Sequence, residues 1–189
     1  MVALWAYTGF IGLLALERLY ELRLSSRNAA QAFARGALEV GVRHYRVMTV
    51  FHTAFLISCV AEPWLLQRDF PGVTAVVAFV FALLAQGLRY WAISTLGEKW
   101  NTRVIVMPGT PPITTGPYRF IKHPNYVAVV IELVAVPLIF GSWITAIVFS
   151  IGNAALLAVR IRAEEKALGE QWHHAFLGKR RFIPGGKGG

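Results

Sequence analysis

GPYRFIKHPNY, residues 116–126, combines a glycine-proline turn, a basic and aromatic run, and a second proline that follows a histidine. Proline restricts its own φ and biases the preceding residue away from helical geometry, so a helix is predicted to begin at Pro124, directly after His123. The first turn of such a helix presents unpaired backbone N–H groups and the positive end of the helix dipole. The stretch therefore predicts a turn that can bind a carboxylate or another anion.

A second polar motif, RIRAEEKAL at residues 160–168, follows an apolar segment that is long enough to cross a bilayer and return. The two motifs are therefore expected to meet at one membrane face. Arg160 and Glu164 are four residues apart and share one face of a continuous helix. As a simple stabilising pair their order is the weaker one, because Glu ahead of Arg or Lys is more favourable. We predict that the active site lies where the two motifs meet.

The composition is that of a membrane protein. Hydrophobic residues make up 56% of the 189 residues and charged residues only 15%, against about 25% charged residues in ordinary soluble domains. The net charge of +9 is compatible with nucleic acid, but the basic residues border apolar segments instead of forming a stripe. Anionic membrane lipids are the favoured partner, and no nucleic acid is expected. The five histidines lack ligand-like spacing, so no metal is predicted.

Apolar segments predict an all-α, polytopic membrane protein in a single domain, 1–189, with five transmembrane helices: 2–20, 45–60, 73–96, 124–140 and 143–159. The Gly141-Ser142 link is so short that it requires antiparallel neighbours, which predicts a helical hairpin near the C-terminus. The polar connection 25–46 fits an amphipathic interfacial helix and a solvated loop equally well. The β-branched run 104–106 favours extended backbone, and the glycine-rich tail 185–189 is expected to be disordered.

Charge placement predicts the orientation in the membrane. Of the nineteen Lys and Arg residues, all except Arg68 fall on one side of the five-span topology. Under the positive-inside rule that side is cytoplasmic, which places the N-terminus outside and the C-terminus inside a cell (inner) membrane. Both polar motifs would then face the cytosol.

Two ionisable residues interrupt the predicted spans: Glu132 in the fourth and His52 in the second. Such residues are costly in lipid and usually face a cavity or a partner. For both we expect a functional place in a cavity, with a buried hydrogen bond as the alternative. Glu165 points away from the Arg160–Glu164 face and is expected to be solvated or to pair with Arg162.

Together, the two motifs resemble the isoprenylcysteine carboxyl methyltransferase family of integral membrane enzymes, which use S-adenosylmethionine. ERLYEL near the N-terminus and LRYWAISTLGEKWNTRVIVMPG at 88–109 are similar to its bacterial branch, which methylates hydroxyls of long-chain alkylpyrones or alkylresorcinols made by type III polyketide synthases. The likeness covers residues 17–184. One departure is Lys122, where the family usually has an arginine before His-Pro; lysine keeps the charge and loses the planar fork.

The resemblance implies a cytosolic cofactor pocket within residues 96–184. It assigns S-adenosylmethionine to Thr110, Pro111, Pro112, Ile113, Gly116, Tyr118, His123, Pro124, Asn125, Tyr126 and Glu164. The matching arginine and first glutamate lie where acceptor and cofactor meet, so Arg160 and Glu164 are the expected catalytic residues. Arg160 would hold the acceptor oxygen, with Glu132 and His52 as further acceptor-binding candidates. Glu164 would either accept the acceptor's proton or hold the cationic end of the cofactor.

The function these observations predict is an S-adenosylmethionine-dependent O-methyltransferase that acts on a lipophilic hydroxyl acceptor, with a type III polyketide synthase as a partner in the same pathway. Carboxyl methylation of isoprenylcysteine is one alternative. A membrane NADPH-dependent reductase and a non-enzymatic lipid-binding or transport protein are two more. No GxGxxG motif follows a predicted strand, which excludes a Rossmann-type methyltransferase.

Overall fold

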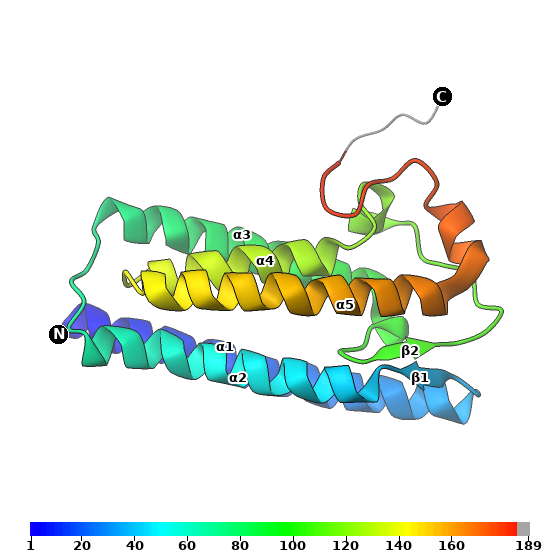
Figure 1. The fold of residues 1–189 in the computed structure, drawn as a ribbon, viewed down its shortest axis with the longest axis horizontal. Coiled ribbons are helices and arrows are strands. Elements are labelled where there is room, and N and C mark those ends of the chain that lie inside the picture. The colour runs from blue at the N-terminus through cyan, green and yellow to red at the C-terminus, as the bar shows by residue number, and fades with distance from the viewer. Residues whose placement is uncertain (185–189) are drawn as a thin grey trace.

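The computed structural model describes residues 1–184; the predicted disorder of 185–189 falls outside this range. Figure 1 shows the helices side by side along one axis, with a small sheet at one end. In chain order the elements are α1 (Val2–Ala34), β1 (Leu38–Val40), α2 (Val42–Leu65), α3 (Val73–Leu96), the 3₁₀ segment η1 (Gly97–Lys99), β2 (Val104–Val106), the 3₁₀ segment η2 (Gly116–Arg119), α4 (Pro124–Leu138) and α5 (Trp143–Ala175).

The predicted multi-pass helical architecture is confirmed in its main feature. Helices α1, α2, α3 and α5 are long and apolar enough to cross a membrane. Helix α4 is apolar but has 15 residues, fewer than the roughly 20 that a full crossing requires. The fifth span therefore stays a prediction, as does the orientation that depends on the number of spans. The all-α class needs one addition, the antiparallel β1–β2 pair.

The polar connection predicted at 25–46 is replaced mostly by helix. Helix α1 continues to Ala34, so neither the solvated loop nor a separate interfacial helix forms. Ser25 and Asn28 are buried on this extension. The Asn28 side chain donates to the Trp100 carbonyl at 2.8 Å, and Ser25 Oγ lies 2.7 Å from Asn101 Oδ1. These polar contacts with residues 100–101 hold the extension in place. They could not be predicted from the spacing of apolar residues in the sequence.

The extended backbone predicted at 104–106 is confirmed as β2, which pairs with β1 in antiparallel register with Leu38 opposite Val106. Helix α2 starts three residues earlier and ends five residues later than its predicted span of 45–60, with Pro63 inside its last turn. Helix α3 has the predicted bounds.

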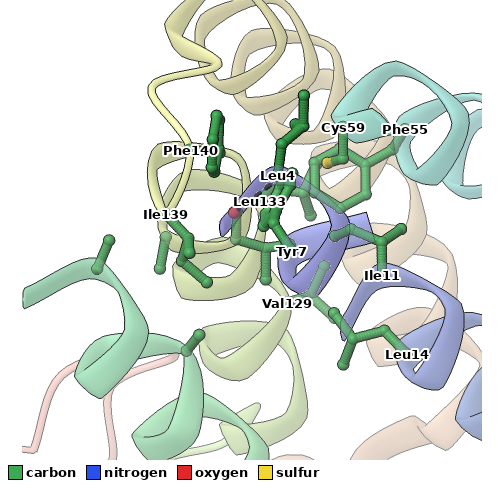
Figure 2. Packing of buried hydrophobic residues seen from close by; sticks show 14 residues of the cluster. Leu4, Tyr7, Ile11, Leu14, Phe55, Cys59, Val129, Leu133, Ile139 and Phe140 are labelled. Carbon is green, nitrogen blue, oxygen red and sulfur yellow. Dashed lines mark hydrogen bonds between the residues drawn. The ribbon is translucent and has the colours of Figure 1, made fainter. Parts of the chain in front are cut away.

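Small side chains set the packing of α3 against α4. Ala75, Ala78, Ala82 and Ala85 recur every three or four residues along α3, and all four are buried. Small residues at this spacing let two helix backbones approach closely without a hydrophobic driving force. Figure 2 shows α1 and α2 contributing to one apolar cluster with α4, which includes Leu4, Tyr7, Ile11, Leu14, Phe55, Cys59, Val129 and Leu133. Helix α4 is thus held from several sides.

The predicted C-terminal hairpin is confirmed, with residues 139–142 joining α4 to α5. Helix α5 continues well past the predicted span and bends at Gly169, whose φ of 71° and ψ of −169° lie in a region essentially restricted to glycine. In Figure 1 the orange end of α5 turns away from the helix axis after this point. The bend lets Trp172 and Phe176 pack against Tyr118 of η2 and Ala92 of α3. It therefore brings the C-terminal region back to the motif at 116–126.

Candidate functional site

The structure brings the two polar motifs together. Helix α4 begins at Pro124 as predicted, with His123 at its N-cap position. Gly116 has a φ of 55°, and a Cβ atom at this position would collide with the side chain of Thr95 on α3. Only glycine fits this turn without a shift of its neighbour, and the turn directs the following residues toward α5.

Tyr126 joins the two predicted catalytic residues. Arg160 Nε donates to the Tyr126 hydroxyl at 2.7 Å, and that hydroxyl donates to Glu164. Arg160 also donates through Nη2 to the Thr102 carbonyl at 2.6 Å, and it is buried. Arg160 and Glu164 therefore share one face of α5, as their spacing predicts, and a single hydroxyl holds them in fixed relation.

A cavity of about 610 Å³, the larger cavity, lies beside this group. Its size falls within the range of small-molecule sites, about 300–1,000 Å³. It is lined by most residues predicted to bind the cofactor: Thr110, Pro111, Pro112, Ile113, Tyr118, His123, Asn125, Tyr126 and Glu164. Gly116 and Pro124 do not belong to this lining. They form the turn and the helix start, so their predicted contact with the cofactor has no counterpart in the cavity wall.

Two residues that line the larger cavity, Gln31 and Asn125, each have a buried side-chain oxygen without a partner among residues 1–184. Asn125 Oδ1 is buried and accepts no hydrogen bond from residues 1–184. The loop at 107–113 is held by Lys99 Nζ, which donates to the Pro111 carbonyl at 3.0 Å, and by the Thr110 hydroxyl, which donates to the Met107 carbonyl at 2.5 Å. Burial, and then the negative charge of Glu164, raise the pKa of the Tyr118 hydroxyl, so this group stays protonated.

A second cavity of about 200 Å³, the smaller cavity, lies between α1, α2, α4 and α5. Arg160, Glu132 and His52, the three residues predicted to bind the acceptor, all line it. His52 Nδ1 lies 2.9 Å from the Met48 carbonyl. Because a carbonyl only accepts hydrogen bonds, this contact places the proton on Nδ1 and leaves Nε2 as an acceptor in the neutral ring.

Glu132 also makes the buried hydrogen bond that was expected from the sequence as the alternative to a binding role. Its carboxylate accepts hydrogen bonds from both Nε and Nη2 of Arg89, with the Nε donor at 2.9 Å. Arg89 lies 3.6 Å from Glu21, which in turn accepts from Arg18 at 2.8 Å. Arg89 is one of the basic residues counted on the cytoplasmic side, but it belongs to α3 and its side chain is buried. Its positive charge therefore carries no information about which side of the membrane faces the cytosol.

Glu165 is neither solvated nor paired with Arg162, and this expectation from the sequence is wrong. The Glu165 side chain is buried and accepts from His123 Nε2 at 3.1 Å and from Arg181 Nε at 2.9 Å. The hydrogen bond to Glu165 raises the pKa of Arg181. Lys122, the departure from the family pattern, lies over the Trp172 ring at 5.4 Å. No sequence signal identifies the contacts of Arg181 and Lys122, because they depend on the bend at Gly169.

The two cavities meet at a shared wall formed by Trp100, Asn101, Asn125, Tyr126 and Arg160. Glu164 lines the larger cavity only, whereas His52 and Glu132 line the smaller one only. Two ligands, one in each cavity, would therefore approach each other beside Arg160 and Tyr126. Among residues 1–184, no group of three or more His, Cys, Asp or Glu side chains is arranged to hold a metal ion.

Comparison with known proteins gives consistent matches. The model of the isoprenylcysteine carboxyl methyltransferase (ICMT) family matches residues 76–170. The uncharacterized protein YpbQ of Bacillus subtilis (strain 168) is 39% identical over 164 residues, which cover 85% of this chain and 95% of YpbQ. An uncharacterized protein of Haemophilus influenzae is 28% identical over 152 residues, 80% of this chain and 88% of its own length. Protein-S-isoprenylcysteine O-methyltransferase of Schizosaccharomyces pombe is 25% identical over 135 residues, 70% of this chain and 57% of that protein.

Proposed function

Because the chain belongs to the isoprenylcysteine carboxyl methyltransferase (ICMT) family of membrane methyltransferases, we propose that it methylates a hydroxyl of a lipophilic acceptor with S-adenosylmethionine. The observation that carries this proposal is the shared wall of the two cavities at Arg160 and Tyr126. The larger cavity would hold the cofactor and the smaller one the reacting head of the acceptor. A transferase needs two such sites in direct contact, whereas a lipid-binding protein needs one.

The chemistry of the larger cavity fits this cofactor. When bound, S-adenosylmethionine supplies a methyl group carried on a positively charged sulfur. The aromatic face of Tyr118 and the carboxylate of Glu164 suit a cation. The unpartnered Asn125 Oδ1 suits an amino or hydroxyl donor, because buried polar atoms are nearly always hydrogen-bonded.

Arg160 is proposed to hold the acceptor oxygen, since it lines both cavities. The acceptor hydroxyl becomes a good nucleophile when its proton passes to water, and a fixed guanidinium stabilises the resulting oxyanion. Glu164 lines the cofactor side alone. This position favours the role of holding the cationic end of the cofactor over that of a base for the acceptor. Tyr126 keeps the two side chains in register.

The acceptor class is proposed from the smaller cavity and the resemblance to the bacterial branch. About 200 Å³ is below the usual size of a site that encloses a whole drug-sized ligand, so the cavity suits a single ring. A long alkyl chain would extend from the ring into the bilayer, past apolar lining residues such as Leu14, Phe55 and Leu157. A long-chain alkylpyrone or alkylresorcinol from a type III polyketide synthase has this form.

A second candidate acceptor is the carboxylate of an isoprenylcysteine. It is favoured by the name of the Schizosaccharomyces pombe relative, a protein-S-isoprenylcysteine O-methyltransferase. A carboxylate is ionised near neutral pH, so this reaction needs no protein base. The same Arg160 would bind the acceptor oxygen in both cases.

The test is methyl transfer by the purified protein in lipid nanodiscs, supplied with deuterated S-adenosylmethionine and one acceptor at a time. The acceptors are a long-chain alkylresorcinol, an alkylpyrone and a farnesylated cysteine, and mass spectrometry identifies the labelled ether or ester. We expect a labelled methyl ether from a hydroxyl acceptor. Binding of NADPH together with no binding of S-adenosylmethionine by calorimetry would instead assign a reductase.

A further inference from the structure

The chain beyond α5 lies directly on the cofactor turn. We call residues 177–184 the C-terminal strap. The backbone N–H of Lys122 donates to the Arg180 carbonyl at 3.0 Å, and that of His123 donates to the Arg181 carbonyl at 3.1 Å. Lys179 Nζ also donates to the Tyr118 carbonyl at 3.3 Å. Three contacts thus join the strap to residues 118–123, which line or border the larger cavity.

One buried carboxylate fastens the strap through side chains. Glu165 Oε1 receives Arg181 Nε at 2.9 Å, and Oε2 receives Arg181 Nη2 at 2.5 Å. This is a bidentate fork, the arrangement that gives an arginine–carboxylate pair its geometric specificity. The Glu165 side chain is 9% exposed and that of Arg181 is 52% exposed, so water weakens the pair from one side only.

The Glu165 carboxylate also fixes the orientation of the His123 ring. His123 Nε2 lies 3.1 Å from Glu165 Oε1, and because an ionised carboxylate only accepts, Nε2 must carry a proton. The ring stacks on Tyr126 at 5.2 Å with 22° between the planes, and it contacts Trp172 at 5.7 Å. Tyr126 in turn holds Arg160. A continuous series of contacts therefore runs from the strap to the place where the two cavities meet.

We propose that Glu165 and Arg181 are positioning residues for the cofactor: Arg181 fastens the C-terminal strap to Glu165, and Glu165 thereby orients His123 and the cofactor turn. The inference rests on the proposed function for its ligand. Neither residue lines a cavity, so both act through His123. Release of the strap exposes the backbone N–H groups of Lys122 and His123, and it removes the arginine that holds Glu165, the hydrogen-bond partner of the His123 ring.

The experiment compares Arg181→Ala with the matched control Arg180→Ala. Arg180 is the exposed neighbour, and its guanidinium has no partner in the described part of the chain. The first measurement is hydrogen exchange of a peptide covering residues 122–123 in the cofactor-free protein in nanodiscs. For a half-exposed but bidentate pair we expect exchange to rise about five- to tenfold in Arg181→Ala. No rise is expected in Arg180→Ala.

The second measurement is calorimetric affinity for S-adenosylmethionine. We expect Arg181→Ala to weaken it about five- to tenfold, with Arg181→Lys recovering part of the loss because one charge remains without the fork. In turnover, the loss should appear in the KM for the cofactor more than in kcat. Glu165→Gln, of nearly the same size, should weaken cofactor affinity at least as much, because it also loosens His123.

Each outcome decides a different point. Unchanged exchange in Arg181→Ala overturns the fastening of the strap. Raised exchange with unchanged cofactor affinity overturns the positioning role. If the wild-type protein binds no S-adenosylmethionine, the proposed function fails, and the exchange measurement still tests the strap by itself.

Discussion

Replacing Arg160 by lysine tests the centre of the proposed site. Lysine keeps the positive charge and has a similar length, but a single ammonium replaces a planar fork of donors. In the wild-type protein the fork donates to the Tyr126 hydroxyl at 2.7 Å and to the Thr102 carbonyl at 2.6 Å. A lysine can reach these partners only by leaving the direction in which the guanidinium faces the shared wall. The substitution therefore removes the planar arrangement of donors while it keeps the positive charge.

The expected loss follows from the number of donors removed. Loss of one preorganised donor to a developing oxyanion costs about 2.7–4 kcal/mol, or roughly a hundred- to thousandfold in kcat. In the resting protein at least one of the two hydrogen bonds made by Arg160 is also lost. A hydrogen bond to a charged group contributes about 1.5–3 kcal/mol to stability. We therefore expect a lower melting temperature as well as slower turnover.

Turnover at saturating cofactor is the assay, with calorimetric cofactor affinity and thermal unfolding measured on the same preparation. Arg162→Lys is the matched control, because Arg162 is an exposed residue on the same helix and its replacement should leave turnover unchanged. Arg160→Lys should bind S-adenosylmethionine with nearly wild-type affinity. Turnover within about fivefold of the wild type would refute the role of Arg160 as the oxyanion donor.

Three further substitutions test the surroundings. Tyr126→Phe keeps the ring but removes the hydroxyl between Arg160 and Glu164, so kcat should fall about tenfold or more in the methyl-transfer assay; unchanged kcat would make the hydroxyl dispensable. Gly116→Ala should destabilise the protein by about 1–3 kcal/mol in thermal unfolding, and a second change, Thr95→Ala, should recover part of this by removing the collision. Glu132→Gln leaves the buried guanidinium of Arg89 incompletely paired and should lower the free energy of unfolding by about 3–5 kcal/mol. A melting temperature equal to that of the wild type would contradict this pairing.

The features that the sequence by itself determined are those that depend on neighbouring residues. Proline at 124 starts α4 because proline restricts the backbone on both sides of its nitrogen. The hairpin between α4 and α5 follows from a link that is too short for any other connection. Arg160 and Glu164 both reach the Tyr126 hydroxyl because residues four apart lie on one face of any α-helix. The apolar segments predict membrane helices for a similar reason, since length and composition are local properties.

Only the tertiary structure decided which of these elements come into contact and through which side chains. Glu165 fastens Arg181 because the chain bends at Gly169 and returns, and no periodicity encodes where a returning segment lies. Glu165 contacts His123 because α5 packs against the start of α4. The joining role of Tyr126 and the shared wall of the two cavities have the same origin. They arise where α4 and α5 pack beside the loop that follows α3, a result of three-dimensional packing between segments far apart in the chain.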